Sequence, residues 1–200
     1  INESKIILVE TKASDLMEAG FDIYVRQGDG ASDYEDLLTD GNFQKYSGDK
    51  SVTIEKGFRL DSNAIPYAPY LLAKDGIVLG SISFYGAEDQ NVALEDSKII
   101  QVRFNKESIE AAKKHSITLK LDELDLTTRL DIPLVQETFK KHLWSIPPSH
   151  TSDVTQLWYG LQWSSNSDSL FWNEYYSLIR LDDNYLMTDF ELAAKVAREE

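Results

Sequence analysis

The chain has 200 residues, 42% of them hydrophobic and 27% charged, a composition typical of a globular protein with its own core and not of a disordered chain. Its 34 acidic residues outnumber 20 basic ones, and the formal net charge of −14 disfavours binding to nucleic acid or to an anionic lipid surface. The absence of cysteine excludes disulfides, thiol catalysis and cysteine-ligated metal sites.

The first two thirds of the chain mainly predict β-strands. Apolar or alternating runs that favour strands occur at residues 6–9, 21–26, 51–60, 70–73, 77–85, 99–104 and 116–121. The Asp75-Gly76 step separates two of these runs, and this dipeptide is the usual signal of a tight β-hairpin. The pattern therefore predicts strands at short intervals, joined by turns.

Few helices are expected in this part. A capping box at residues 32–35 predicts a helical turn that Gly41 ends, and Asn105 is expected to cap a helix over residues 106–114. A parallel α/β fold would need longer helices between the strands. Residues 1–133 are therefore predicted to form a mainly β domain, an antiparallel β-sandwich that is Ig-like in general build.

The character of the sequence changes after Pro133. A helix is expected over residues 134–143, residues 182–184 resemble a hairpin turn, and a capping box predicts a helix over residues 188–198. Residues 134–200 are therefore predicted to form a smaller α+β extension. This extension is either an appendage on the β domain or a further part of the same core.

All four tryptophans lie between residues 144 and 172, with several tyrosines beside them. One interpretation is that these rings form the core of the C-terminal part. The other is that some of them stand exposed beside the polar loop of residues 164–169, as a platform for a carbohydrate or a peptide. On this second interpretation, the predicted ligand-binding residues are Trp158, Tyr159, Trp163, Asn166, Asp168 and Trp172.

The acidic residues between Asp29 and Asp40 are the one candidate for a hard-cation site. Counted from Asp29, however, the sixth position is Tyr34, where an EF-hand loop requires glycine. The alternative is a solvated helix start, where the helix dipole favours acidic residues. We therefore predict no metal site.

No catalytic motif occurs in the chain. The three histidines are dispersed, and there is no nucleophile elbow, phosphate-binding loop or dinucleotide fingerprint. A carboxylate pair for glycoside hydrolysis could be drawn from Asp168, Glu174, Asp182 and Asp183, although a chain with 34 acidic residues offers such pairs by chance. We predict no catalytic residue and no cofactor, and keep a glycan-active enzyme as a lesser alternative.

These features predict a non-enzymatic binding or interaction module whose partner is a protein or a glycan. Because the chain opens at Ile1 without methionine and is strand-rich and acidic, we expect the extracytoplasmic part of a secreted or membrane-anchored bacterial protein. No apolar run approaches the roughly 18 residues of a membrane helix, so no membrane insertion is expected. The alternative is an acidic cytoplasmic immunity or inhibitor protein that neutralises a basic partner, with residues 29–40 steering association.

Overall fold

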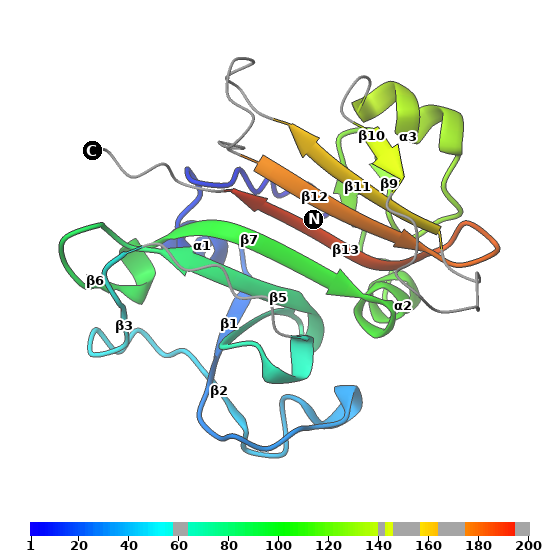
Figure 1. Ribbon diagram of the computed structural model, residues 1–200. Coiled ribbons are helices and arrows are strands. Elements are labelled where there is room, and N and C mark those ends of the chain that lie inside the picture. The colour runs from blue at the N-terminus through cyan, green and yellow to red at the C-terminus, as the bar shows by residue number, and fades with distance from the viewer. Residues whose placement is uncertain (58–63, 140–142, 146–156, 164–174, 195–200) are drawn as a thin grey trace.

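The computed structural model describes residues 1–57, 64–139, 143–145, 157–163 and 175–194. Its main element is an antiparallel sheet with the strand order β10-β11-β12-β13-β7-β5-β4-β1-β2 (Figure 1). The strands of this sheet are β1 (Asp22–Arg26), β2 (Phe43–Lys45), β4 (Tyr70–Lys74), β5 (Ile77–Tyr85), β7 (Lys98–Asn105), β10 (Leu143–Ser145), β11 (Leu157–Trp163), β12 (Tyr175–Leu181) and β13 (Met187–Ala194). The mainly β prediction is confirmed, whereas the sandwich-like, Ig-like build is not confirmed.

Two small two-stranded sheets accompany the large one. One pairs β3 (Thr53–Ile54) with β6 (Val92–Ala93), and the other pairs β8 (Lys120–Leu121) with β9 (Leu124–Asp125). The strand expected at residues 51–60 is thus confirmed only over β3, and residues 58–60 lie outside the described part of the chain.

The described helices are short. They are α1 (Ala13–Glu18), α2 (Lys106–Lys114) and α3 (Ile132–Phe139), with 3₁₀ turns η1 (Tyr34–Asp36), η2 (Ile65–Tyr67) and η3 (Leu94–Asp96). The predicted helix over residues 106–114 is confirmed, while the helical turn expected between residue 32 and Gly41 is only the 3₁₀ turn η1. The helix α1 was not predicted, because its six residues are too few for a clear helical periodicity. None of the described helices is long and apolar enough to cross a membrane.

The strand predicted at residues 6–9 is absent, and the one predicted at residues 116–121 is present only over β8. Leu8, Ile117 and Leu119 are nevertheless buried in the core cluster. Their side chains reach the core from irregular backbone, and apolar residues that alternate with polar ones indicate burial as readily as strand pairing. The strand prediction was therefore wrong for residues 6–9 and 116–119, although their apolar residues do belong to the core.

The predicted helix over residues 188–198 is wrong where the chain is described, because residues 187–194 form β13. A capping box is a local signal, and here tertiary pairing overrides it: β13 pairs with β12 on one side and with β7 on the other. Phe190 of β13 stacks on Phe104 of β7, with ring centroids 5.7 Å apart and an interplanar angle of 15°. A strand that is hydrogen-bonded on both sides is stabilised by pairing with distant segments of the chain, and a local sequence motif does not indicate such pairing.

The turn predicted at residues 182–184 is confirmed between β12 and β13. The Asp182 carboxylate accepts hydrogen bonds from the backbone N–H groups of Asn184 at 2.8 Å and Leu186 at 3.0 Å. Aspartate favours turns because its side chain can bind the backbone N–H two residues on.

The sheet continues across the predicted domain boundary between residues 133 and 134. β13 pairs with β7 from Asp189 opposite Asn105 to Ala193 opposite Gln101. The same hydrophobic cluster contains Ile82 of β5 and Ile179 of β12, both almost fully buried. The division into residues 1–133 and 134–200 itself stays a prediction.

The hairpin predicted at Asp75-Gly76 is confirmed, because β4 and β5 pair directly across it, with Lys74 opposite Ile77. Both turn residues have positive φ, 51° for Asp75 and 77° for Gly76, as a type I′ turn requires. Only glycine adopts this conformation at no steric cost, whereas aspartate and asparagine tolerate it.

Replacing Gly76 by alanine is therefore expected to lower the free energy of unfolding by about 1–2 kcal/mol, because the added Cβ is strained at positive φ. Replacing Asp75 by asparagine is the matched control and should change stability by less than about 0.5 kcal/mol. Urea unfolding curves measure both effects. Equal stability of the Gly76→Ala variant and the wild type would argue against the type I′ turn.

Candidate functional site

The structure describes the predicted aromatic site only in part. Trp158, Tyr159 and Trp163 belong to β11, whose backbone register sets them opposite Arg180, Ile179 and Tyr175 of β12. Asn166, Asp168 and Trp172 lie outside the described residues. The structure thus brings the first three onto one strand, next to the sheet's edge strand β10, and the aromatic platform stays a prediction.

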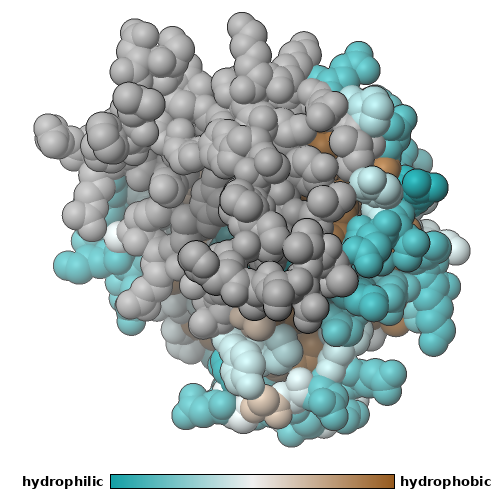
Figure 2. All heavy atoms as spheres, turned by 45° about the vertical axis from the view of Figure 1, so that its right-hand side comes forward, coloured by the Kyte–Doolittle hydropathy of each residue, from teal (hydrophilic) through white to brown (hydrophobic). Residues whose placement is uncertain are grey.

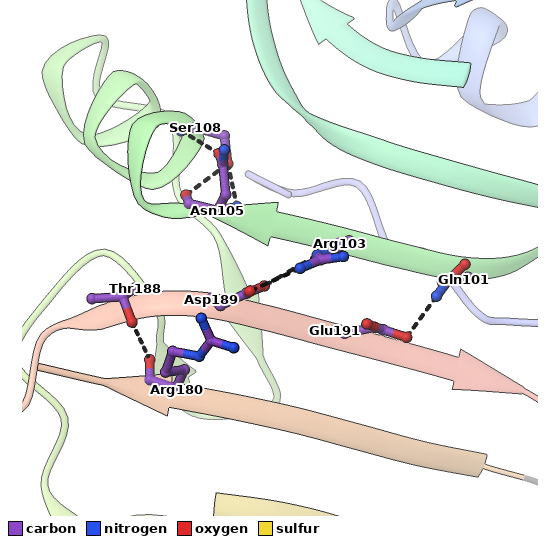
Figure 3. A network of polar contacts seen from close by, with 8 residues as sticks. All are labelled: Gln101, Arg103, Asn105, Ser108, Arg180, Thr188, Asp189 and Glu191. Atoms are coloured by element: carbon purple, nitrogen blue, oxygen red, sulfur yellow. Dashed lines mark hydrogen bonds and ion pairs between the residues drawn. The ribbon is translucent and has the colours of Figure 1, made fainter. Parts of the chain in front are cut away.

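A row of polar side chains crosses one face of the sheet at its centre (Figure 3). The Arg103 guanidinium donates two hydrogen bonds to the Asp189 carboxylate, from Nη2 at 2.9 Å and from Nε at 3.3 Å. Gln101 Nε2 donates to Glu191 Oε1 at 2.6 Å, and Ser83 Oγ donates to Gln101 Oε1 at 2.8 Å. The polar row therefore links β5, β7 and β13.

The polar row is largely shielded from solvent, and Arg103 is its most exposed member. Exposed fractions are 18% for the Arg103 side chain, 8% for the Asp189 side chain and 2% for Gln101. Arg180 of β12 lies beside the Arg103–Asp189 pair (Figure 3), and burial lowers the pKa of its guanidinium; Asp189 opposes this shift, and Arg103 adds to it. Because its carboxylates are already engaged by buried donors, we assign the polar row to holding β7 against β13 and not to binding a ligand.

The sequence of residues 188–191 contains a pattern that indicates part of this row, but the segment was interpreted as the start of a helix. Asp189 and Glu191 alternate with Phe190 and Leu192, which is the period of two typical of a strand. That alternation would have placed both carboxylates on one face. It could not have identified Gln101 and Arg103 as their partners, since those residues lie almost 90 positions away.

The helix α2 follows directly after β7, the strand that contributes Gln101 and Arg103 to the polar row. Asn105 is its N-cap: the side-chain Oδ1 accepts a hydrogen bond from Ser108 N at 3.0 Å, and Asn105 N donates to Ser108 Oγ at 3.0 Å. The helix buries Ile109 and Ala112 against the core. The strand, held by the polar row, and the capped first turn thus fix the position of α2.

Replacing Asn105 by alanine is expected to lower the free energy of unfolding by about 1 kcal/mol, because the first turn of α2 loses its capping acceptor. Asn105→Asp keeps an acceptor at the same place and serves as the control, with stability near that of the wild type. Thermal or urea unfolding measures the difference. An Asn105→Ala variant as stable as Asn105→Asp would show that the cap does not hold the helix.

A groove of about 510 Å³ lies between α2, η1 with the residues that follow it, and the β4–β5 hairpin; we call it the α2 groove. Its lining consists of Tyr34, Glu35, Leu38, Thr39, Gly76, Ile77, Val78, Glu107, Glu110, Ala111, Lys114 and His115. On the face that Figure 2 shows, the described surface is mostly hydrophilic, with small apolar areas between the hydrophilic ones. Unlike the polar row, most of these lining side chains are exposed or half-buried.

Tyr34 joins two walls of the α2 groove. Its hydroxyl donates a hydrogen bond to the backbone carbonyl of Val78 in β5. Burial raises the pKa of this hydroxyl above its ordinary value, and the negative charge of Glu107 raises it further. The hydroxyl therefore stays a protonated donor at neutral pH, and its hydrogen bond to Val78 joins η1 to β5.

The charges of the α2 groove differ between its ends. Glu107 lies in the first turn of α2, and Glu35 follows Tyr34 in the opposite wall. Lys114 and His115 lie at the other end of the helix. Glu110 lies between the ends, and its Oε1 is 3.9 Å from Nζ of Lys106 on the helix surface. Such an exposed ion pair stabilises the fold by less than about 1 kcal/mol.

The acidic segment of residues 29–40 shows no cation site in the structure. The Asp40 carboxylate accepts hydrogen bonds from the Ser32 hydroxyl and from the backbone N–H of Asn42 at 2.9 Å, and these bonds, Ser32 first, lower its pKa. Within the described ranges, no group of three or more histidines and carboxylates is placed to hold a metal ion. The carboxylate of Asp40 thus serves to shape its own loop.

Comparisons with protein-family models, with curated protein sequences and with solved structures gave no match to this chain. The α2 groove is therefore chosen as the candidate site on its own geometry. It is concave and open, and it combines an apolar floor with charged side chains at its rim. The polar row is largely shielded from solvent, and the aromatic site is only partly described.

Proposed function

We propose that this protein is a non-enzymatic binding module that engages a basic protein partner in the α2 groove. The observation that carries the proposal is the α2 groove itself, in which glutamates rim an apolar floor. Pockets that combine apolar walls with a few placed polar groups are typical binding sites, since the walls provide buried area and the polar groups provide specificity.

The apolar floor comes from Leu38, Ile77 and Ala111, which line the groove and are half-buried. A partner side chain that covers these residues removes their remaining apolar surface from water, at about 25 cal/mol per Å². The glutamates beside the floor favour a partner side chain that is both long and cationic. Lysine and arginine fit this description, because their aliphatic stems pack on apolar surface while their charged ends reach a carboxylate.

The net charge of the whole chain also favours binding of a basic partner. A net charge of −14 attracts a cationic partner from a distance and raises the rate of association. Salt screens this attraction, with a Debye length of about 8 Å at physiological ionic strength. Binding that weakens as salt rises is therefore expected of the proposed interaction.

The location of the protein is also a proposal. We propose an extracytoplasmic module of a secreted or membrane-anchored protein, and a cytoplasmic inhibitor of a basic protein is the alternative. Both engage a basic partner, so the α2 groove supports them equally. Cell fractionation of the source organism, followed by antibody detection, distinguishes them.

The proposal is tested with fluorescently labelled random-sequence heptapeptides that carry two fixed lysines. We expect the wild type to bind this pool and the Glu107→Gln/Glu110→Gln variant to bind it about tenfold more weakly, because each lost charge pair contributes on the order of 0.5–1 kcal/mol. Fluorescence anisotropy measures the affinities.

The control variant is Asp122→Asn/Glu123→Gln. It removes the same number of charges from exposed residues in the turn between β8 and β9, which do not line the α2 groove. This variant is expected to bind like the wild type. If both double variants weaken binding equally, the interaction follows overall charge alone and the proposed site is wrong.

A further inference from the structure

We propose that the α2 groove selects an extended partner segment with a cationic and an acidic side chain about three residues apart. This inference rests on the proposed function and specifies the partner that the groove accepts. It follows from the spacing of the charges along one helix face.

One face of α2 lines the groove from end to end. Glu107, Ala111 and Lys114 follow one another at intervals of four and three residues, so they form a single stripe on the helix. With a rise of about 1.5 Å per residue, Glu107 and Lys114 lie about 10.5 Å apart along the helix axis. The groove therefore presents a negative and a positive side chain from positions about two helical turns apart, with Ala111 between them and Glu110 beside Ala111.

The α2 groove has charged side chains on the wall opposite α2 as well as on the helix itself. Glu35, which follows Tyr34 in η1, adds a further carboxylate to the lining from the wall opposite α2. The cation of the lining is Lys114, the last residue of α2. The free energy of binding is therefore expected to be most favourable when the cation of the partner segment lies near Glu107 and its carboxylate lies near Lys114.

The separation of these charges fits an extended segment. An extended chain in the polyproline II conformation has three residues per turn and rises about 3.1 Å per residue, so side chains three residues apart lie on the same side, about 9.3 Å apart. A segment whose charged residues lie three positions apart is therefore extended in this way, and the two side chains between them project from other sides of the chain.

Two blocked hexapeptides test this inference. Both have lysine at position 2, and position 5 is glutamate in one and lysine in the other. The measured quantity is the ratio of their dissociation constants, the dilysine value divided by the lysine–glutamate value. We expect Lys114→Glu to lower this ratio about tenfold, because a carboxylate that Lys114 attracts is then repelled and a second lysine is attracted.

Lys113→Glu is the matched control. Lys113 is exposed and precedes Lys114 on α2, and it does not line the groove, so the variant makes the same change in net charge at a neighbouring site. It should change the ratio less than twofold. An equal change in both variants, or no change in either, overturns the inference.

Failure of this inference is distinguishable from failure of the proposed function. If Glu107→Gln weakens the binding of both peptides while Lys114→Glu leaves the ratio unchanged, the groove binds cations without selecting a spaced pair. The proposed function then stands and this inference falls. If Glu107→Gln leaves the binding of both peptides unchanged, both proposals fall.

Discussion

Replacing Asp189 by alanine is expected to lower the free energy of unfolding by about 2–4 kcal/mol, because the largely buried guanidinium of Arg103 loses its bidentate carboxylate. The two side chains are 18% and 8% exposed, so solvent screens their interaction only weakly. Urea unfolding at neutral pH, in low and in high salt, measures the effect. Salt should change it little, in contrast to an exposed ion pair.

The double variant Arg103→Met/Asp189→Leu is the control for this prediction. Apolar residues of similar volume remove both charges together, so the double variant should recover most of the stability that Asp189→Ala loses. An Asp189→Ala variant destabilised by less than about 1 kcal/mol would show that the polar row does not hold β7 against β13.

Replacing Phe190 by alanine is expected to lower the free energy of unfolding by about 3–5 kcal/mol, because it removes a large side chain that is 2% exposed. A double-mutant cycle with Phe104→Ala should give a coupling of about 0.5–1.5 kcal/mol, since the two rings stack across β7 and β13. Thermal or urea unfolding of the four proteins measures both quantities.

The control for Phe190 is Leu192→Ala. Leu192 lies on the same strand but is only half-buried, so Leu192→Ala should lower the free energy of unfolding clearly less than Phe190→Ala does. Equal costs at the two positions, or additive effects of Phe104→Ala and Phe190→Ala, would contradict the placement of residues 187–194 as a strand beside β7.

The elements that the sequence predicted well are those set by local chemistry. The Asp75-Gly76 hairpin and the Asn105 helix cap each depend on side chains within a few residues of one another. The turn at Asp182 is of the same kind. In each case the local preference and the final fold agree.

The segment around residues 188–191 shows where local chemistry fails. Its capping box is real as a pattern, but pairing with β7 and β12 and burial of Phe190 outweigh the intrinsic preference for a helix, which amounts to less than about 1 kcal/mol per residue. The polar row was missed for the same reason. Its members come from segments far apart in the chain, and only the folded sheet brings them together.

The α2 groove could be predicted only in part. The stripe of Glu107, Glu110, Ala111 and Lys114 is visible in the sequence as one helix face. Its opposite walls come from residues 34–39 and 76–78, and no local pattern indicates that these segments meet α2. The sequence directed attention instead to the tryptophans, because aromatic clusters are conspicuous whether they serve a core or a site.

The most direct test of the central claim is the change in backbone amide NMR shifts when the lysine–glutamate hexapeptide is added to the wild type. We predict that the shifts concentrate at residues 34–39, 76–78 and 107–115, which form the α2 groove, and that they are lost in the Glu107→Gln/Glu110→Gln variant. Shifts that concentrate instead in β11, around Trp158 and Trp163, would contradict the account and favour the aromatic platform.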